Sequence, residues 1–222
     1  MIDVIPAIIP RVFKDIEGQV SLVKNSVSKV QIDISDGIFS KNTTWPFRND
    51  TGEWEKLQNE EIGLPFWDDI DYEFHLMVED PDTFASFCIS AGASSIVVHI
   101  EKIKDIESLK KMCDKKDVKL IIAILPKTPL SNLLPFISLC NGVQFMGSNR
   151  IGYHGEKIDE IVYKKIKELR DMYPDLSIGI DIGVTEENAP ILVDAGVSVF
   201  VAGSLIFDSI DKTEIIEYLK DL

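Results

Sequence analysis

Short apolar runs rich in β-branched residues recur along the chain, and each is followed by an amphipathic segment and a glycine or a turn. This alternation is typical of parallel β-α-β units. Eight units predict one closed (β/α)8 TIM barrel, a single domain over residues 1–222 with no visible linker. The predicted strands centre on residues 4–5, 30–32, 72–74, 96–98, 120–122, 143–145, 177–179 and 199–201.

The segments between these runs carry apolar residues at helical spacing. The clearest is predicted to present one apolar face made of Ile158, Ile161, Val162, Ile166 and Leu169. Two Ala-Gly pairs, at residues 91–92 and 195–196, are predicted to end helices, because glycine tolerates the left-handed conformation that follows a helix.

Composition excludes several classes of partner. The chain has 222 residues, of which 45% are hydrophobic, and its formal net charge is −14. Such a charge repels nucleic acids and anionic lipids. A small anionic substrate is still compatible, because backbone amides bind phosphate locally. The beginning of the chain does not resemble a signal peptide and no apolar run is long enough to span a membrane, so we expect a cytoplasmic protein.

Asp33 and Asp181 stand at the carboxyl ends of the second and seventh predicted strands. A TIM barrel keeps its catalytic groups at these ends. Two carboxylates facing one pocket can remove a proton from one side of a carbon and return it on the other. The pair therefore suggests epimerisation.

His75 lies on the third predicted strand and is expected to converge with the two aspartates at the mouth of the barrel. Strand side chains alternate, so Gln31 shares the face of Asp33, and Met77 that of His75. Carboxylates and an imidazole together suit a divalent metal such as zinc, manganese or iron. The alternative is that these strand-end residues only cap helices or pair with arginine.

Two glycine-containing turns are candidates for binding a phosphate. They are residues 152–155, Gly-Tyr-His-Gly, and Gly203-Ser204 after the last strand. Each is expected to lead from a strand into a helix, where backbone amides can approach an anion.

Two further segments exceed what a connection needs. Residues 37–53 follow the second strand and are expected either to set specificity on the catalytic face or to form a structural cap. Residues 64–69 precede the third strand and are expected on the opposite face, as a plug or a subunit contact in a homo-oligomer.

Six segments, taken in order, resemble ribulose-phosphate 3-epimerases over nearly the whole chain. The family motifs are Pro-Ser-Ile-Leu, His-Val-Asp-Val-Met-Asp-Gly, Asp-x-His-Leu-Met-Val, Gly-Phe-Gly-Gly-Gln, Val-Asp-Gly-Gly and Val-Ala-Gly-Ser. They match residues 6–9, 31–37, 74–78, 152–156, 180–183 and 201–204.

The resemblance implies a role for each matched residue. Asp33 and Asp181 would be the acid/base pair that epimerises C3 of a ketopentose phosphate through an enediolate. Two histidines and these aspartates would hold a divalent metal that stabilises the enediolate. The substrate would be bound by Met77, Met146, Gly155, Gly183, Gly203 and Ser204.

Four departures from the family pattern alter the metal and phosphate sites. The first metal-binding histidine is replaced by Gln31, a weaker ligand for zinc or iron, so we expect a weakly bound metal. Ala7 replaces a serine, His154 a glycine of the phosphate loop, and Ile182 the glycine after Asp181.

Two alternatives to a divergent epimerase are open. The barrel could bind a sugar phosphate without catalysis and retain its aspartates as buried polar groups. It could also be a phosphate-barrel lyase, but such lyases carry a lysine where this chain has Ser35, in the strand that contains Asp33 and Asp36. The presence of both aspartates together with His75 favours the enzyme.

Overall fold

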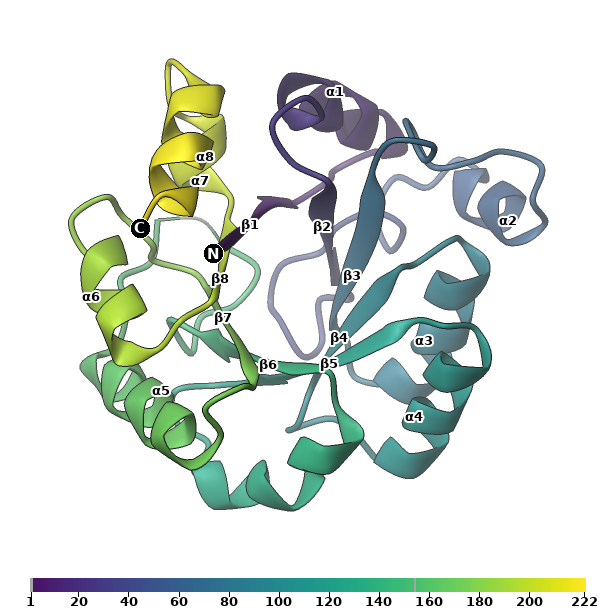
Figure 1. Ribbon diagram of the computed structural model, residues 1–222. Coiled ribbons are helices and arrows are strands. Elements are labelled where there is room, and N and C mark those ends of the chain that lie inside the picture. Colours follow the sequence, from purple (N-terminus) through teal and green to yellow (C-terminus); the bar gives the residue numbers. More distant parts are fainter. Residues whose placement is uncertain (1, 154) are drawn as a thin grey trace.

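Eight parallel strands close into a barrel in chain order, and β8 pairs with β1. The structure is a computed structural model that describes residues 2–153 and 155–222. Figure 1 shows the strands as an inner ring with the helices around it. Every predicted strand centre falls within a strand, which confirms the (β/α)8 barrel. The strands are β1 (Asp3–Ile8), β2 (Lys29–Ser35), β3 (Asp71–Met77), β4 (Ser95–His99), β5 (Lys119–Ile124), β6 (Gly142–Met146), β7 (Ser177–Asp181) and β8 (Val199–Ala202).

The helices bury one apolar stripe each against the outside of the barrel. In α1 the side chains of Ile16, Val20 and Val23 are fully buried, at the i, i+4, i+7 spacing of a single face. Between β5 and β6 two short 3-10 helices, η1 (Leu130–Asn132) and η2 (Leu134–Leu139), take the place of an α-helix. The α-helices are α1 (Phe13–Val23), α2 (Glu53–Gln58), α3 (Pro81–Ser90), α4 (Ile106–Lys115), α5 (Glu160–Met172), α6 (Ala189–Ala195), α7 (Ser204–Phe207) and α8 (Lys212–Lys220).

The predicted apolar face of α5 is only partly right. Val162, Ile166 and Leu169 are fully buried, but Ile161 is 39% exposed. Adjacent helical residues point about 100° apart, so Ile161 cannot share the stripe of Val162. Ile158 precedes the helix and packs against the core from the loop.

Both predicted glycine helix ends are confirmed. Gly92 follows α3 with φ +98°, and Gly196 follows α6 with φ +116°. Both angles lie in the left-handed region that favours glycine. Each residue ends its helix and directs the chain into the next strand.

The segment 37–53 divides into two parts. Its first half lies near the pocket described below, because Asn42 Nδ2 donates a 2.7 Å hydrogen bond to the carbonyl of Gly152. Its second half is structural, since Trp45 is fully buried with its ring centroid 5.2 Å from those of Phe13 and Trp54. The second half is therefore the structural cap that was one of the two alternatives, while a role of the first half in specificity stays a prediction.

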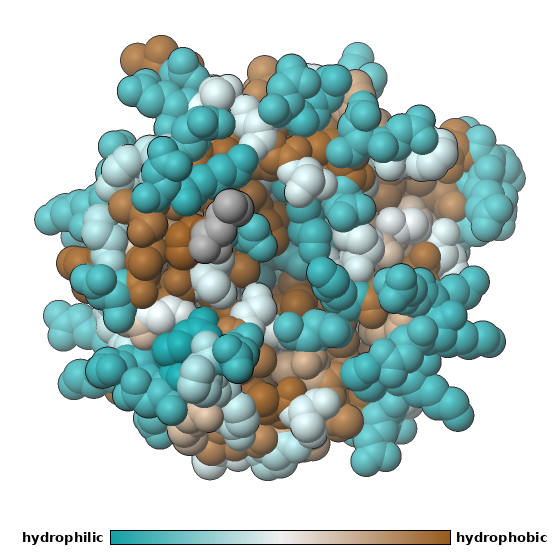
Figure 2. Space-filling model, viewed as in Figure 1, coloured by the Kyte–Doolittle hydropathy of each residue, from teal (hydrophilic) through white to brown (hydrophobic). Residues whose placement is uncertain are grey.

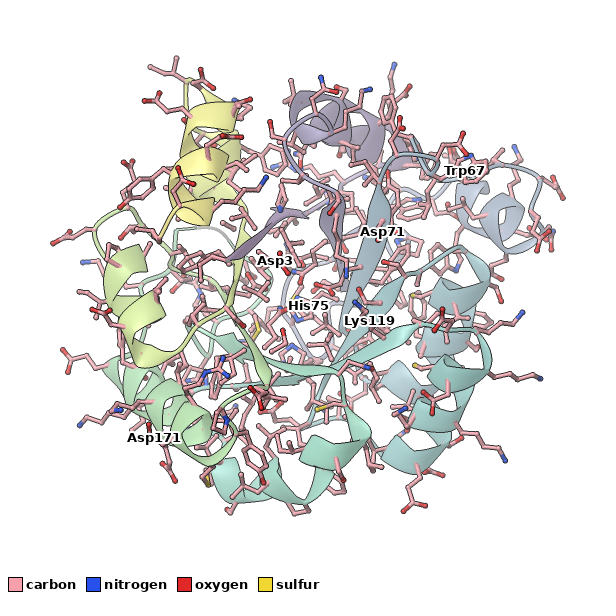
Figure 3. All side chains as sticks on the ribbon, viewed as in Figure 1. Asp3, Trp67, Asp71, His75, Lys119 and Asp171 are labelled. Carbon is pink, nitrogen blue, oxygen red and sulfur yellow. The ribbon has the colours of Figure 1, made fainter. Side chains whose placement is uncertain are left out.

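Residues 64–69 precede β3 and so lie at the amino ends of the strands, as expected. The Tyr72 hydroxyl donates a hydrogen bond to the carbonyl of Pro65, while Trp67 is 66% exposed. Figure 3 shows Trp67 at the outer edge of the molecule. This segment therefore contributes nothing to the catalytic face.

Charged and polar side chains cover much of the surface. In Figure 2 hydrophilic residues project around the rim of the face shown, with apolar areas between them. None of the helices in the described part of the chain combines the length and apolarity that a membrane crossing requires.

Candidate active site

The barrel brings Asp33, His75 and Asp181 together from β2, β3 and β7. Asp33 and His75 are paired across the β2–β3 register, and all three residues are buried. Their nearest ligand atoms all lie within 4.8 Å of one another. Figure 3 shows His75 inside the ring of strands. The predicted convergence of these three residues is therefore present in the structure.

His75 links the two carboxylates. Its Nδ1 lies 3.2 Å from Asp33 Oδ1 and 3.4 Å from Asp181 Oδ2. Burial alone lowers the pKa of His75, but hydrogen bonds to Asp181 and Asp33 outweigh it and raise the pKa to about 9. Burial also raises the pKa of Asp33, and the charge of Asp181 acts in the same direction. In the metal-free site His75 is therefore protonated at neutral pH.

Gln31 occupies the fourth position around this centre. Its Nε2 lies 2.8 Å from Asp33 Oδ1, 3.3 Å from His75 Nδ1 and 3.4 Å from Asp181 Oδ2. The other amide atom, Oε1, is buried and accepts no hydrogen bond from any described residue. Turning the amide over exchanges these two atoms and directs the carbonyl oxygen at the centre.

These spacings match those between ligands of a metal ion. Bonds of about 2.0–2.1 Å in a tetrahedral site place ligand atoms about 3.3 Å apart. The distances from His75 Nδ1 to the two carboxylates and to Gln31 are 3.2, 3.4 and 3.3 Å. The residues present therefore fit a divalent metal, with two carboxylates, one imidazole and one weak amide ligand.

Metal affinity is expected to rise with pH. A metal ion must displace the proton on His75 Nδ1, and the pKa of this side chain is raised to about 9. Below that pH, metal affinity should increase about tenfold per pH unit, because each unit lowers the concentration of the competing proton tenfold. Isothermal titration calorimetry in buffers of different ionisation enthalpy should show proton release. Affinity independent of pH from about 6.5 to 8.5 would contradict this expectation.

One pocket on the catalytic face connects Asp33 and Asp181 to the carboxyl end of β8. The pocket is bounded by the predicted acid/base pair at one end and by glycine backbone at the other. All six residues that were predicted to bind substrate line it, namely Met77, Met146, Gly155, Gly183, Gly203 and Ser204.

The turn after β7 is tightly packed and strained. Gly183 has φ +81°, and a Cβ there would lie 2.8 Å from the backbone nitrogen of Ile158, so only glycine fits. Ile182 before it has φ +77°, a conformation that β-branched residues rarely adopt and that costs about 1–3 kcal/mol. Its position in the pocket lining makes it a wall of the candidate site.

The two glycine-containing turns differ from the prediction in one respect. Gly155 does not lead directly into a helix, because α5 begins only at Glu160. Gly203-Ser204 does lead into a helix, but α7 has only four residues. An anion at these two turns would therefore be bound mainly by backbone amides, and not by the dipole of a long helix. His154 lies outside the described residues.

Ser35 stands where the family motif matched to residues 31–37 has a methionine, but it binds a loop instead of forming a wall of the pocket. Its hydroxyl donates a 2.7 Å hydrogen bond to Ser40 Oγ in the loop after β2. Thr44 holds the same loop to the strand, since its hydroxyl donates to the carbonyl of Asp33 at 2.8 Å. The pair of serines therefore positions a loop and does not line the pocket.

Three polar residues near the centre were not predicted as site residues, of which Gln144 and His99 are buried and Glu101 is partly exposed. Gln144 donates from Nε2 to Asp181 Oδ2 at 3.2 Å. His99 ends β4, Glu101 follows it by two residues, and both continue outward from His75. The alternation of side chains along β4 and β6 was the signal that could have identified them.

Solved structures of other enzymes share this fold. KGPDC from Streptococcus mutans, solved with a bound ligand, superposes with a TM-score of 0.73 over 99% of this chain and 95% of its own, at 14% identity. The 3-hexulose-6-phosphate synthase of Salmonella typhimurium gives a TM-score of 0.70 over 99% and 97%, at 12% identity. At such identities the likeness concerns the fold alone.

Sequence relatives cover nearly the whole chain. The ribulose-phosphate 3-epimerase of Bacillus subtilis is 28% identical over 99% of both chains. That of Aquifex aeolicus is 30% identical over 90% of this chain and 86% of its own. The model of the ribulose-phosphate 3 epimerase family matches residues 3–207. As the six motifs indicated, the chain belongs to the ribulose-phosphate 3-epimerase family.

Proposed function

We propose that this barrel epimerises C3 of a ketopentose phosphate, with D-ribulose 5-phosphate as the first substrate to test. The observation that carries the proposal is the pair of buried carboxylates, Asp33 and Asp181, which reach one pocket from β2 and β7. A carbon held between them presents one face to each. That arrangement suits two-base epimerisation, in which one group removes the proton and the other supplies a new one.

The two carboxylates take complementary roles, one as the proton donor and the other as the base. In one direction of the reaction the base is assigned to Asp181 and the donor to Asp33. Asp181 takes the C3 proton, and the electron pair moves onto the adjacent carbonyl to give an enediolate. Asp33 then delivers its proton to the opposite face of C3. In the reverse direction the roles exchange.

Asp33, His75, Asp181 and Gln31 are proposed as ligands of a weakly bound zinc, iron or manganese ion. When bound, the metal stabilises the negative charge of the enediolate as a Lewis acid. Asp33 Oδ1 and Asp181 Oδ2 are the oxygens that face His75. This leaves the second oxygen of each carboxylate free for proton transfer.

Met77 and Met146 are proposed to shield the intermediate from water. Both side chains are buried, line the pocket and pack together in one apolar cluster with Val97, Ala123 and Ile151. Apolar walls keep water from protonating the enediolate on the wrong face. The two methionines therefore support stereochemical control without taking part in proton transfer.

The phosphate is proposed to bind between Gly183 and Gly203-Ser204, opposite the carboxylates. Sulfate should occupy this position in soaked crystals and should compete with the sugar phosphate, because both anions are held by the same backbone amides. Inhibition by sulfate should raise the KM and leave kcat unchanged. Only water at this position in high sulfate, with no saturable binding of sugar phosphates, would contradict a phosphorylated substrate.

A cytoplasmic location belongs to the same proposal. A rice relative, 30% identical over 66% of this chain, is named a cytoplasmic isoform, whereas an Arabidopsis relative is named chloroplastic. Cell fractionation with an antibody against the native protein tests this location.

The proposed reaction can be tested by NMR. Metal-supplemented protein mixed with D-ribulose 5-phosphate should produce the C3 epimer until equilibrium is reached. Saturable binding of the sugar phosphate without any epimer would favour the non-catalytic binding protein. Loss of carbon from the substrate would favour the lyase.

A further inference from the structure

Buried polar side chains continue outward from His75 to the end of β4. His75 Nε2 lies 2.9 Å from Nε2 of His99, and the two rings stack with their centroids 5.1 Å apart. His99 Nδ1 in turn lies 3.4 Å from Glu101 Oε2. Both histidine side chains are fully buried. His99 and Glu101 do not line the substrate pocket and have no role in the mechanism above.

The contact between Nε2 of His75 and Nε2 of His99 limits which ring nitrogens can carry a proton. A hydrogen bond of this kind needs an N–H on one ring and a lone pair on the other. To bind a metal, His75 must present a lone pair at Nδ1, the atom that faces Asp33 and Asp181. The single proton of its neutral ring then lies on Nε2, and His99 must accept it.

Glu101 sets the tautomer in which His99 can accept a hydrogen bond from His75. To present a lone pair at Nε2, neutral His99 must carry its proton on Nδ1, which faces Glu101. Oε1 of Glu101 already accepts hydrogen bonds from the Leu125 backbone at 2.9 Å and from the Thr128 hydroxyl. Oε2 remains, and neither it nor His99 Nδ1 has another partner among the described residues. A small rotation of either side chain aligns the two atoms.

An aromatic side chain packs against His99. Phe39, from the loop after β2, lies edge-on to the His99 ring with centroids 4.9 Å apart. The ammonium group of Lys102 lies 5.1 Å from the centroid of the Phe39 ring. Phe39 and His75 therefore both contact the His99 ring and limit its movement.

We propose that His99 and Glu101 are positioning residues that fix the tautomer of His75, so that its Nδ1 lone pair faces the metal site. The inference rests on the proposed function of His75 as a metal ligand. Partners that hydrogen-bond the second nitrogen of such a histidine typically change metal affinity or activity by about 10- to 100-fold. Neither residue touches the substrate or the metal in this account.

The first test compares two replacements of His99 by titrating Mn²⁺ into the metal-free protein without substrate, at about pH 8. His99→Phe keeps a planar ring but removes the acceptor, so it should weaken Mn²⁺ binding by about 10- to 100-fold. His99→Gln can place its amide oxygen near the former Nε2 and accept from His75. It should therefore retain affinity within about threefold of the wild type.

Glu101→Gln is the sharper variant, because it conserves size and can still accept from Leu125 and Thr128. Its amide can donate an N–H to His99 Nδ1, which moves the proton of His99 to Nε2. His75 would then have to accept at its own Nε2 and carry its proton on Nδ1, where it blocks the metal. We expect about tenfold or greater loss of Mn²⁺ affinity with little change in melting temperature.

Val98→Ala on the same strand is the matched control, since Val98 is fully buried on the face of β4 opposite to His99 and its truncation removes buried volume but no polar contact. It should lower the melting temperature and leave Mn²⁺ affinity unchanged. Wild-type affinity in His99→Phe or in Glu101→Gln would overturn the inference. So would equal losses in His99→Phe, His99→Gln and Val98→Ala, or a wild type that does not bind Mn²⁺. Epimerisation by the wild type is measured separately and tests the proposed function alone.

Discussion

Replacing Asp33 or Asp181 by asparagine is expected to lower the turnover number by about a hundredfold or more. Asparagine has nearly the same shape as aspartate but cannot accept and return a proton at this position. Each variant should therefore retain the fold and lose the reaction. Initial rates with D-ribulose 5-phosphate at saturating substrate measure the effect, and circular dichroism reports the fold.

Asp175→Asn provides the matched control for these two variants. Asp175 is exposed and precedes β7, at the end of that strand opposite to Asp181. Its replacement makes the same chemical change far from the pocket and should leave the rate unchanged. Near-normal rates in both Asp33→Asn and Asp181→Asn would remove the basis of the two-base mechanism.

Gln31→His is expected to strengthen metal binding by about 10- to 100-fold. The imidazole would replace the weakest of the four ligands, whose Nε2 now lies 2.8 Å from Asp33 Oδ1 and whose Oε1 has no partner among the described residues. The wild type should purify with less than one equivalent of zinc or iron, and the variant with more. Elemental analysis after dialysis against a chelator measures both.

A histidine placed elsewhere controls for adventitious binding. Gln58 lies at the end of α2, outside the barrel, and Gln58→His should leave the metal content unchanged. Wild-type protein that keeps one equivalent of metal through the dialysis would show that Gln31 is not a weak ligand. An unchanged affinity in Gln31→His would show that the ligand geometry is different.

The barrel could be predicted from the sequence because a short run rich in β-branched or aromatic residues marks each strand, and most crossovers show helical spacing. The crossover between β5 and β6 instead forms two 3-10 helices. The convergence of Asp33, His75 and Asp181 followed from two local facts, that each lies at or within two residues of the carboxyl end of a strand and that side chains alternate. The exposure of Ile161 was missed because adjacent helical residues point about 100° apart, so Ile161 lies beside the stripe formed by Val162, Ile166 and Leu169.

Other features of the site depend on tertiary contacts that the spacing of residues along the sequence does not reveal. The contact between His75 and His99 depends on the rotamers of two rings on neighbouring strands. The left-handed conformation of Ile182 is imposed by packing around Gly183 and could not be read from its residue type, which disfavours it. The position of Gln31 around the metal centre was expected, but not that one of its amide atoms would lack a partner.

Hydrogen exchange at C3 in deuterated water tests the central claim most directly, because the enediolate forms before the new stereocentre is set. With the wild type, mass spectrometry and NMR should find solvent deuterium at C3 of both epimers. Asp33→Asn and Asp181→Asn should each fail to interconvert the epimers, although one of them can still exchange the proton of one epimer, since a single base can remove and return it on its own face. Epimerisation without deuterium at C3, or unchanged exchange into both epimers by both variants, would contradict the account.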